Sequence, residues 1–445
     1  MNRTLSIETV TKIGEEVLLK GWINARRNMG KIVFLDLRDR GGIVQLVGVS
    51  SQMDAESVER MKDVRHEWVV EVTGVVQERG EKQKNSNVPT GNVEVLIKEL
   101  RVLSMAEPLP IDLEDDKVGL DIHLDHLPIT LRAERWQDVF KVQETIIQSF
   151  REALAQEQFT EFQSPALVGG DAEGGSAVFK VDYFYNQKAY LATSPQLYKQ
   201  IMTGVFERVF TTAKIFRAEK SATTRHLSEI VQMDFEMGFI NDQYDVMAML
   251  EKVIKHIVAR VVEKHASVFA KRGVPLPLSG EKFPIFKLHE AQDILGAPHS
   301  DDLDPEQERA ICEWAKKEKN SDFVFITHFP TKARAWYTYE EPSEAPLSRG
   351  FDLLFRGLEI NSGAQRVHSY ETLVEKIKSR GLDPEKFSFY LEAFKYGMPP
   401  HGGCSTGLER ITARMLEIPN VKEAVLFPRD LNRIDLQLSP PENKQ

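Results

Sequence analysis

The sequence predicts an α+β protein in two parts, a small β-barrel domain followed by a larger domain of mixed strands and helices. The N-terminal part contains short apolar runs separated by glycine and proline turns, a pattern typical of a barrel. Residues 106–117 combine prolines with an acidic run, which breaks both strand and helix periodicity. We therefore expect the barrel at residues 1–105, a hinge at 106–130 and the larger domain at 131–445.

Composition narrows the functional classes. The chain has 445 residues, of which 42% are hydrophobic and 28% charged, and a net charge of −10, so an RNA partner would have to bind a local basic patch. It contains neither a bilayer-spanning apolar run nor a signal peptide, which predicts a cytoplasmic protein without a membrane partner. Two cysteines, Cys312 and Cys404, exclude a disulfide framework.

The first domain has the strand pattern of an oligonucleotide-binding barrel. Strands are expected at residues 17–23, 32–38, 43–47, 68–76 and 93–97, with one helix at 51–61. Five strands with a helix between the third and fourth predict an OB-type barrel. Basic residues surround Phe34 on the first hairpin: Arg26, Arg27, Lys31, Arg38 and Arg40. Such a face suits single-stranded RNA, unless Phe34 packs in the core and the arginines form a solvated rim.

The second domain begins with a helix and contains a later segment in which no catalytic or binding residues are recognised. Apolar residues at three- and four-residue steps predict a helix from Glu134, which leads to a proline-interrupted strand at 159–167. This unit could be core packing or a homodimer seam. Residues 266–346 are rich in prolines and acids, which indicates a peripheral insertion.

A charged loop between two strands is the centre of the second domain. Strand patterns at 209–212 and 233–239 predict an antiparallel pair, and the residues between them include Glu219, Arg225 and His226. Loops of this length are usually functional when ordered, although a solvated charged loop would have the same composition.

Three further segments carry candidate binding groups. Ser194 is expected to cap a helix with Pro195 in its first turn, and Gln196 and Lys199 then share one helix face that favours an anion. The strand pair at 351–366 offers Glu359 and Ser362 as hard oxygen ligands for Mg²⁺. Residues 399–410 read as a glycine-rich turn into a helix, which could cradle a phosphate beside Arg410. A surface lysine and a simple helix entry are the alternatives.

In this order, the segments resemble the class II aminoacyl-tRNA synthetases, and within them the aspartyl-tRNA synthetases of the archaeal and eukaryotic type. The resemblance rests on four stretches that span most of the chain: Ser194–Gln200, Phe216–Glu229, Leu358–Arg366 and Tyr396–Gly403, with Gly407–Arg410 as a further motif. It implies an OB anticodon-binding domain and a catalytic domain built on an antiparallel sheet flanked by helices. The implied partners are ATP, Mg²⁺, L-aspartate, tRNA-Asp and a second copy of the chain.

The resemblance also implies a role for each matching residue. Arg217, Arg410 and Glu359 would be catalytic, and Mg²⁺ would bind Glu359 and Ser362. The ATP contacts would be Arg217, Ala218, Glu219, Arg225, His226, Leu227, Glu359, Gly407, Leu408, Glu409 and Arg410. Aspartate would meet Glu173, Gln196, Lys199, Arg217, Asp234, Ser362 and Arg366, and the anticodon would meet Phe34, Gln45, Arg26 and Glu94.

Lys199 and Arg366 decide the expected amino acid, because they would bind the side-chain carboxylate. Asparagine would leave both buried cations unpaired, which predicts discrimination of order a thousandfold or more. Ser405 departs from the family, which usually has glycine there, and Asn24 stands where strict archaeal enzymes have tryptophan. Asn24 and Pro89 together suggest an enzyme that also charges tRNA-Asn. The alternatives are an asparaginyl-tRNA synthetase and a non-catalytic RNA-binding paralogue.

Overall fold

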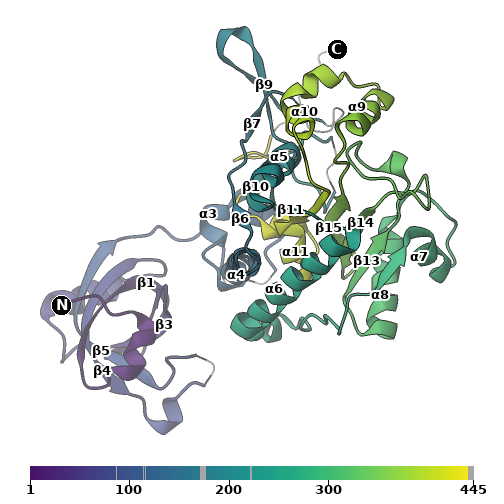
Figure 1. The fold of residues 1–445 in the computed structure, drawn as a ribbon. Coiled ribbons are helices and arrows are strands. Elements are labelled where there is room, and N and C mark those ends of the chain that lie inside the picture. The colour runs from purple at the N-terminus through teal and green to yellow at the C-terminus, as the bar shows by residue number, and fades with distance from the viewer. Residues whose placement is uncertain (87, 114, 116, 171–176, 221–222, 439–445) are drawn as a thin grey trace, which may run out of the picture. The chain divides into compact units, whose positions relative to one another are not determined.

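The chain forms two compact units, Met1–Asp112 and Leu113–Gln445 (Figure 1). The computed structural model describes residues 1–86, 88–113, 115, 117–170, 177–220 and 223–438. Part of the expected hinge is helical, since it contains α2 (Leu120–Asp125) and α3 (Leu127–Thr130). Both helices belong to the second unit. Arg433 fixes α2 there by donating to the Leu124 carbonyl and the Asp125 carboxylate. In the described part of the chain, no helix has the length and apolar character needed to cross a membrane.

The first unit is a closed five-stranded barrel with the order β1-β2-β3-β5-β4, which confirms the OB-type prediction. Its elements are β1 (Glu16–Asn28), β2 (Ile32–Asp39), β3 (Gly42–Val49), α1 (Ala55–Asp63), β4 (Val69–Glu78) and β5 (Val93–Ser104). Alternate residues such as Leu35 and Val72 point inward and are fully buried. Helix α1 begins at Ala55 and not at the expected residue 51. The Asp54 side chain accepts from the Ser57 amide and caps the helix at this point.

The second unit is built on a mixed sheet of eight strands in the order β12-β13-β14-β15-β16-β11-β10-β6. The strands are β6 (Thr160–Glu161), β10 (Arg208–Phe216), β11 (Glu229–Gly238), β12 (Ile285–Lys287), β13 (Phe323–Thr327), β14 (Gly350–Phe355), β15 (Leu358–Gln365) and β16 (His401–Gly407). The neighbours pair antiparallel except at the two edges, where β12–β13 and β10–β6 are parallel.

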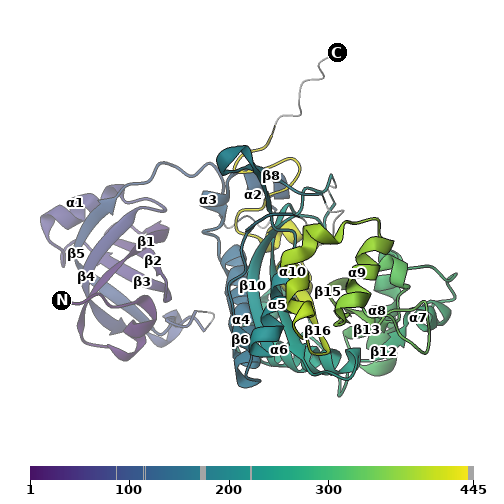
Figure 2. The same ribbon diagram turned by 45° about the horizontal axis from the view of Figure 1, so that its top comes forward.

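Helices cover both faces of this sheet (Figure 2). They are α4 (Glu134–Gln156), α5 (Gln196–Phe206), α6 (Gln243–Arg272), α7 (Leu288–Ile294), α8 (Pro305–Lys319), α9 (Tyr370–Ser379), α10 (Ser388–Lys395) and α11 (Leu408–Met415). Phe150 of α4 packs edge-on against Phe210, so α4 covers that face. Asp234 of β11 points to the opposite face, where it meets Lys199 of α5.

Two sequence expectations about this unit are wrong. The interrupted strand at 159–167 is two separate strands, because Pro165 cannot continue a ladder: β6 joins the large sheet, whereas β7 (Leu167–Val168) joins β8 (Lys180–Asp182) and β9 (Lys188–Leu191). The segment 266–346 is not wholly peripheral, since it supplies β12 and β13 to the large sheet. Every residue of β13 is buried where it pairs with β14.

Candidate active site

The charged loop lies between the two longest strands of the large sheet, as the sequence predicts. β10 and β11 pair antiparallel up to Phe216 opposite Glu229. The Arg217 amide then donates to the Ser228 carbonyl at 2.9 Å, and the Ser228 amide donates to the Arg429 carbonyl at 2.7 Å. Both ends of the loop are therefore fixed to the sheet and to the C-terminal segment.

A cavity of about 160 Å³ lies against this loop and strands β15 and β16. Most residues predicted to bind ATP line it: Arg217, Glu219, Arg225, His226, Leu227, Glu359, Gly407, Glu409 and Arg410. Ala218 and Leu408 do not. Ala218 faces a separate, more apolar pocket, and Leu408 is buried with 3% exposure. The fold thus brings three distant segments of the chain to one charged cavity.

Arg410 and Glu359 form one wall of the cavity. Arg410 Nη1 donates to the Glu359 backbone carbonyl at 3.0 Å and to its carboxylate at 3.3 Å. Burial and the nearby Asp352 carboxylate raise the pKa of Glu359, while Arg410 and Arg334 oppose the rise. Solvent reaches 35% of the Glu359 side chain, so water in the cavity moderates this effect.

Two charged residues that contact cavity-lining side chains come from the segment to which the sequence assigned no chemistry. Glu308 of α8 accepts from Arg225 Nη1 at 2.9 Å. Arg334 forms a two-pronged ion pair with Asp352, at 2.6 and 3.0 Å, and also donates to Ser362 Oγ at 3.3 Å. In the sequence, these residues resemble any solvated charge of a polar helix or loop, so no local signal could identify them.

Helix α5 carries two predicted site residues on its buried face. It begins at Gln196, with Pro195 as the cap residue, rather than at Pro195. Ser194 still stabilises this end, because its hydroxyl accepts from the Gln196 amide at 3.2 Å. Gln196 is 4% exposed and Lys199 is 1% exposed, which excludes the alternative of a surface lysine.

Lys199 belongs to a fully buried network of two cations and two carboxylates. Its ammonium lies 2.9 Å from Asp234, 3.4 Å from Glu236 and 3.1 Å from the Cys404 carbonyl. Arg366 Nε donates to Glu236 at 3.0 Å, and its Nη2 donates to the Gly403 carbonyl at 2.9 Å. Among the described residues these charges balance, with Lys199 and Arg366 paired to Asp234 and Glu236.

Glu236 is the member of this network that sequence analysis missed. Burial favours its neutral form, but the charges of Arg366 and Lys199 outweigh that effect and lower the pKa of Glu236. Period-two alternation with Asp234 could have placed it on the same face of β11. Glu173, the other residue predicted to meet the amino group, lies outside the described residues.

Strand register aligns a row of polar residues across the sheet. Asp234 of β11 pairs with Ser405 of β16, Ser405 pairs with Ser362 of β15, and Ser362 pairs with Asp352 of β14. Directly paired residues project to the same face, so these four side chains share the face of α5 and the cavity. Ser405 also lines the cavity and lies in a regular strand, outside the left-handed backbone region.

The glycine-rich stretch before Arg410 is a strand and not a phosphate-binding turn. Residues 401–407 form β16, between β11 and β15. A Cβ at Gly403 would lie 2.2 Å from both Glu236 Oε2 and the Phe235 carbonyl. Glycine is needed there because the backbone passes directly against the buried carboxylate.

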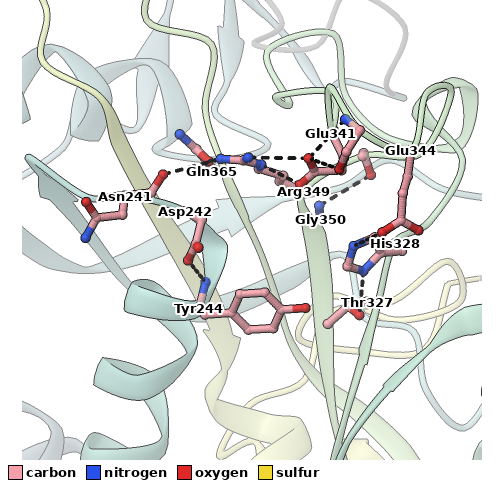
Figure 3. A network of polar contacts seen from close by, with 12 residues as sticks. Asn241, Asp242, Tyr244, Thr327, His328, Glu341, Glu344, Arg349, Gly350 and Gln365 are labelled. Atoms are coloured by element: carbon pink, nitrogen blue, oxygen red, sulfur yellow. Dashed lines mark hydrogen bonds and ion pairs between the residues drawn. The ribbon is translucent and has the colours of Figure 1, made fainter.

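A second polar network supports the end of β15 next to Arg366 (Figure 3). Arg349 donates to Gln365 at 2.7 Å and to Glu341 at 2.8 Å. The hydrogen bond from Arg349 lowers the pKa of Glu341 to about 2. This network connects the 331–349 segment to Gln365, the last residue of β15, which directly precedes Arg366.

Three of the residues predicted to read the anticodon gather on one outer face of the barrel. Phe34 is half-buried between inward-facing neighbours, so it points outward and is not a core residue. Gln45 donates to Glu94 at 3.0 Å and accepts from Arg27 at 3.2 Å. Arg26 does not join them, because it donates to the backbone carbonyls at the end of α1.

Comparisons with known proteins cover both units. The family of class II tRNA synthetases (D, K and N) matches residues 119–431, and the OB-fold nucleic acid binding domain matches residues 17–103. The chain is 42% identical to an aspartate–tRNA(Asp/Asn) ligase from Thermus thermophilus, over 97% of this chain and 99% of that one. It is 38% identical to an aspartate–tRNA(Asp) ligase from Thermococcus kodakarensis, over 95% and 96%.

Solved structures agree with this result. The chain is similar to asparaginyl-tRNA synthetase from Pyrococcus horikoshii complexed with asparaginyl-adenylate, with a TM-score of 0.90, 30% identity and coverage of 98% and 99%. Aspartyl-tRNA synthetase from Entamoeba histolytica gives a TM-score of 0.86 at 28% identity, with coverage of 98% and 93%. The resemblance inferred from the sequence is thus confirmed, and the chain belongs to the class II tRNA synthetases of the D, K and N group.

Proposed function

We propose that this chain is an aspartate–tRNA ligase that activates L-aspartate with ATP and transfers it to the 3′ end of tRNA-Asp. The observation that carries the proposal is the buried pair of cations, Lys199 and Arg366. Lys199 pairs with Asp234, which stands opposite the cavity-lining Ser405 in the sheet. Relatives named as aspartate–tRNA ligases, at 38–42% identity over nearly the full length, support the same substrate.

Arg217, Arg225 and Arg410 are the groups we assign to the phosphates of ATP. All three line the cavity, and their guanidinium groups offer the paired N–H donors that suit phosphate oxygens. The substrate α-carboxylate attacks the α-phosphate, so the protein contributes by orienting both groups and neutralising charge. We assign Arg217 to the α-phosphate and the substrate carboxylate, because it lies where loop and sheet meet, and Arg225 and Arg410 to the outer phosphates. Glu219 and His226, also in the cavity wall, are assigned to the adenine side.

Mg²⁺ is the metal that fits the oxygen donors of this wall. Glu359 and Ser362 line the cavity, and Asp352 is paired across from Ser362. No cluster of three or more metal-ligating side chains occurs among the described residues. A site with so few protein ligands fits Mg²⁺, which is commonly held by one or two carboxylates together with substrate phosphates. When bound, the metal would neutralise phosphate charge.

The pairing of Lys199 and Arg366 changes the physical reason for choosing aspartate. The cations are not left unpaired without a ligand carboxylate, because Asp234 and Glu236 already balance them. Arg366 uses two of its five N–H donors in the contacts described above, so donors remain for a substrate. An asparagine amide would turn an NH₂ group toward these donors. That mismatch costs about 1–3 kcal/mol per group. At about 1.5 kcal/mol for each of the two cations, it predicts discrimination of about a hundredfold or more.

We assign the remaining amino-acid contacts to Asp234, Glu173 and Gln196. Asp234 Oδ1 has no hydrogen-bond partner among the described residues, although Oδ2 is bonded to Lys199. An α-ammonium group would supply the missing donor. Gln196 lies on the same buried face of α5 as Lys199 and would help to orient the side chain.

We further propose that the chain acts in the cytoplasm as a homodimer and reads the anticodon with Phe34, Gln45 and Glu94. Phe34 and Gln45 lie on one outward face of the barrel, with a ring for stacking and an amide for hydrogen bonding. The α4–β6 unit, at the edge of the large sheet, is the proposed dimer seam.

Aminoacylation of transcribed tRNA tests the proposed function. Radiolabelled aspartate should be transferred to tRNA-Asp in the presence of ATP and Mg²⁺, and absence of transfer would contradict the proposal. Asn24 and relatives named for tRNA(Asp/Asn) favour charging of tRNA-Asn as well. Asn24 accepts from Arg38 at 2.7 Å on the barrel. Undetectable aspartylation of tRNA-Asn would rule out this second activity.

A further inference from the structure

Glu308 is a charged group that contacts Arg225 in the wall of the nucleotide cavity and that the proposed reaction does not use. It lies in the first turns of α8, and Asp304 caps that helix by accepting from the amides of Glu306 and Gln307 at 2.8 and 2.9 Å. The Glu308 amide itself donates to the Asp304 carbonyl at 2.9 Å. The cap therefore fixes the direction from which this carboxylate approaches the cavity.

The carboxylate of Glu308 meets an arginine that lines the cavity. Arg225 Nη1 donates to Glu308 Oε2 at 2.9 Å, and the two side chains are 26% and 12% exposed. Burial raises the pKa of Glu308 above its ordinary value, and the charges of Arg225 and Arg410 offset only part of that rise. Glu308 is thus close enough to interact with both arginines that we assign to the outer phosphates.

A carboxylate and a phosphate compete for the same guanidinium donors. Both present two oxygens in a plane that matches the arginine fork. Arg225 belongs to the loop between β10 and β11, whereas Glu308 belongs to a separate helix, so the ion pair links two elements that are far apart in the chain. Glu308 takes one of the five N–H donors of Arg225 and part of its charge, so a phosphate at this arginine either displaces the carboxylate or shares the guanidinium with it.

We propose that Glu308 is a competing counter-ion, which holds Arg225 before ATP binds and takes it back when pyrophosphate leaves. The proposal rests on the proposed function only in taking a triphosphate as ligand. It predicts that Glu308 weakens the binding of both ATP and pyrophosphate and thereby speeds the release of pyrophosphate. A purely positioning role, in which Glu308 orients Arg225 toward the phosphates, predicts the opposite effect on affinity.

Titration calorimetry of the full chain with magnesium pyrophosphate and with AMP separates these roles. Glu308→Gln keeps the side-chain shape and removes the charge. The Kd for pyrophosphate should fall about two- to fivefold, as expected for an ion pair that solvent partly screens. The Kd for AMP should not change, because AMP lacks the outer phosphates. Glu306→Gln is the matched control: it removes an exposed carboxylate from the same helix and should behave as the wild type.

A double variant tests whether the effect passes through Arg225. In an Arg225→Gln background, Glu308→Gln should no longer tighten pyrophosphate binding. A gain that persists there, or an unchanged or higher Kd in Glu308→Gln alone, would overturn the proposal. If wild-type protein binds no pyrophosphate, the nucleotide assignment fails with it. If pyrophosphate binds as described but aspartate-dependent exchange is absent, the amino-acid assignment fails and the role of Glu308 stands.

Discussion

The two ends of the candidate site hold their charges in different ways. At the nucleotide end, Arg217, Arg225, Arg410 and Glu359 keep between 26% and 41% of their side chains exposed. At the amino-acid end, the four charges centred on Lys199 are almost completely buried. Water therefore screens the first set, while the second set depends on exact pairing within the protein. Ion pairs at the nucleotide end should therefore contribute mainly to catalysis. Those at the amino-acid end should contribute to both catalysis and folding stability.

Removing Lys199 should give the largest effect, because it breaks the buried end. In Lys199→Leu, Asp234 loses its cation and Glu236 loses one of two, so the free energy of unfolding should fall by about 3 kcal/mol or more. Aspartate activation should be lost while ATP binding survives in the folded variant. Urea denaturation and ATP titration measure the two effects. Loss of ATP binding by folded protein would show that Lys199 is misassigned.

Removing Arg410 should affect catalysis without a matching effect on folding. Arg410→Ala takes away a phosphate donor, which should lower the rate of ATP–pyrophosphate exchange by about 10²–10³-fold. Its partner Glu359 remains accessible to water, so the free energy of unfolding should change by less than about 1 kcal/mol. A destabilisation as large as that of Lys199→Leu would erase the distinction between the two ends.

Glu409 combines features of the two ends, because it is a buried carboxylate at the nucleotide end. Burial raises its pKa to about 7, although its carboxylate accepts from the Val231 amide at 2.9 Å. The folded state holds this proton more tightly than the unfolded state, so the stabilisation is complete below about pH 4 and is lost as pH rises through about 7. Glu409→Gln should therefore be more stable than wild type at pH 8, by about 1–3 kcal/mol, and similar to it at low pH. Urea denaturation at both pH values checks this, and equal gains at both would contradict it.

Sequence patterns predicted the parts of the molecule that depend on local periodicity. Apolar runs between glycine and proline turns located the barrel strands, and the spacing of Gln196 and Lys199 placed both on one helix face. The outward position of Phe34, which the sequence left open, was settled by the burial pattern of β2. The charged loop followed from the two strands around it. These features depend on the direction of side chains within one helix or strand, and that direction follows from the spacing of residues in the sequence.

Other features depend on contacts between distant elements and leave no local signal. The ion pair of Glu308 with Arg225 joins a helix to a loop of another part of the fold. The glycines of β16 resemble a turn in the sequence, yet Gly403 is required by a carboxylate on the neighbouring strand. The pairing of Lys199 with Asp234 also changed the account of specificity, because the sequence shows two cations but not which anions balance them.

If the buried cations Lys199 and Arg366 select a carboxylate, ATP–pyrophosphate exchange should depend on which amino acid is supplied. Exchange should be measured with aspartate and asparagine on the same wild-type preparation. We expect exchange with aspartate and a kcat/KM for asparagine lower by about a hundredfold or more. Comparable exchange with asparagine would contradict the assignment of Lys199 and Arg366, and exchange with neither amino acid would favour a non-catalytic RNA-binding paralogue.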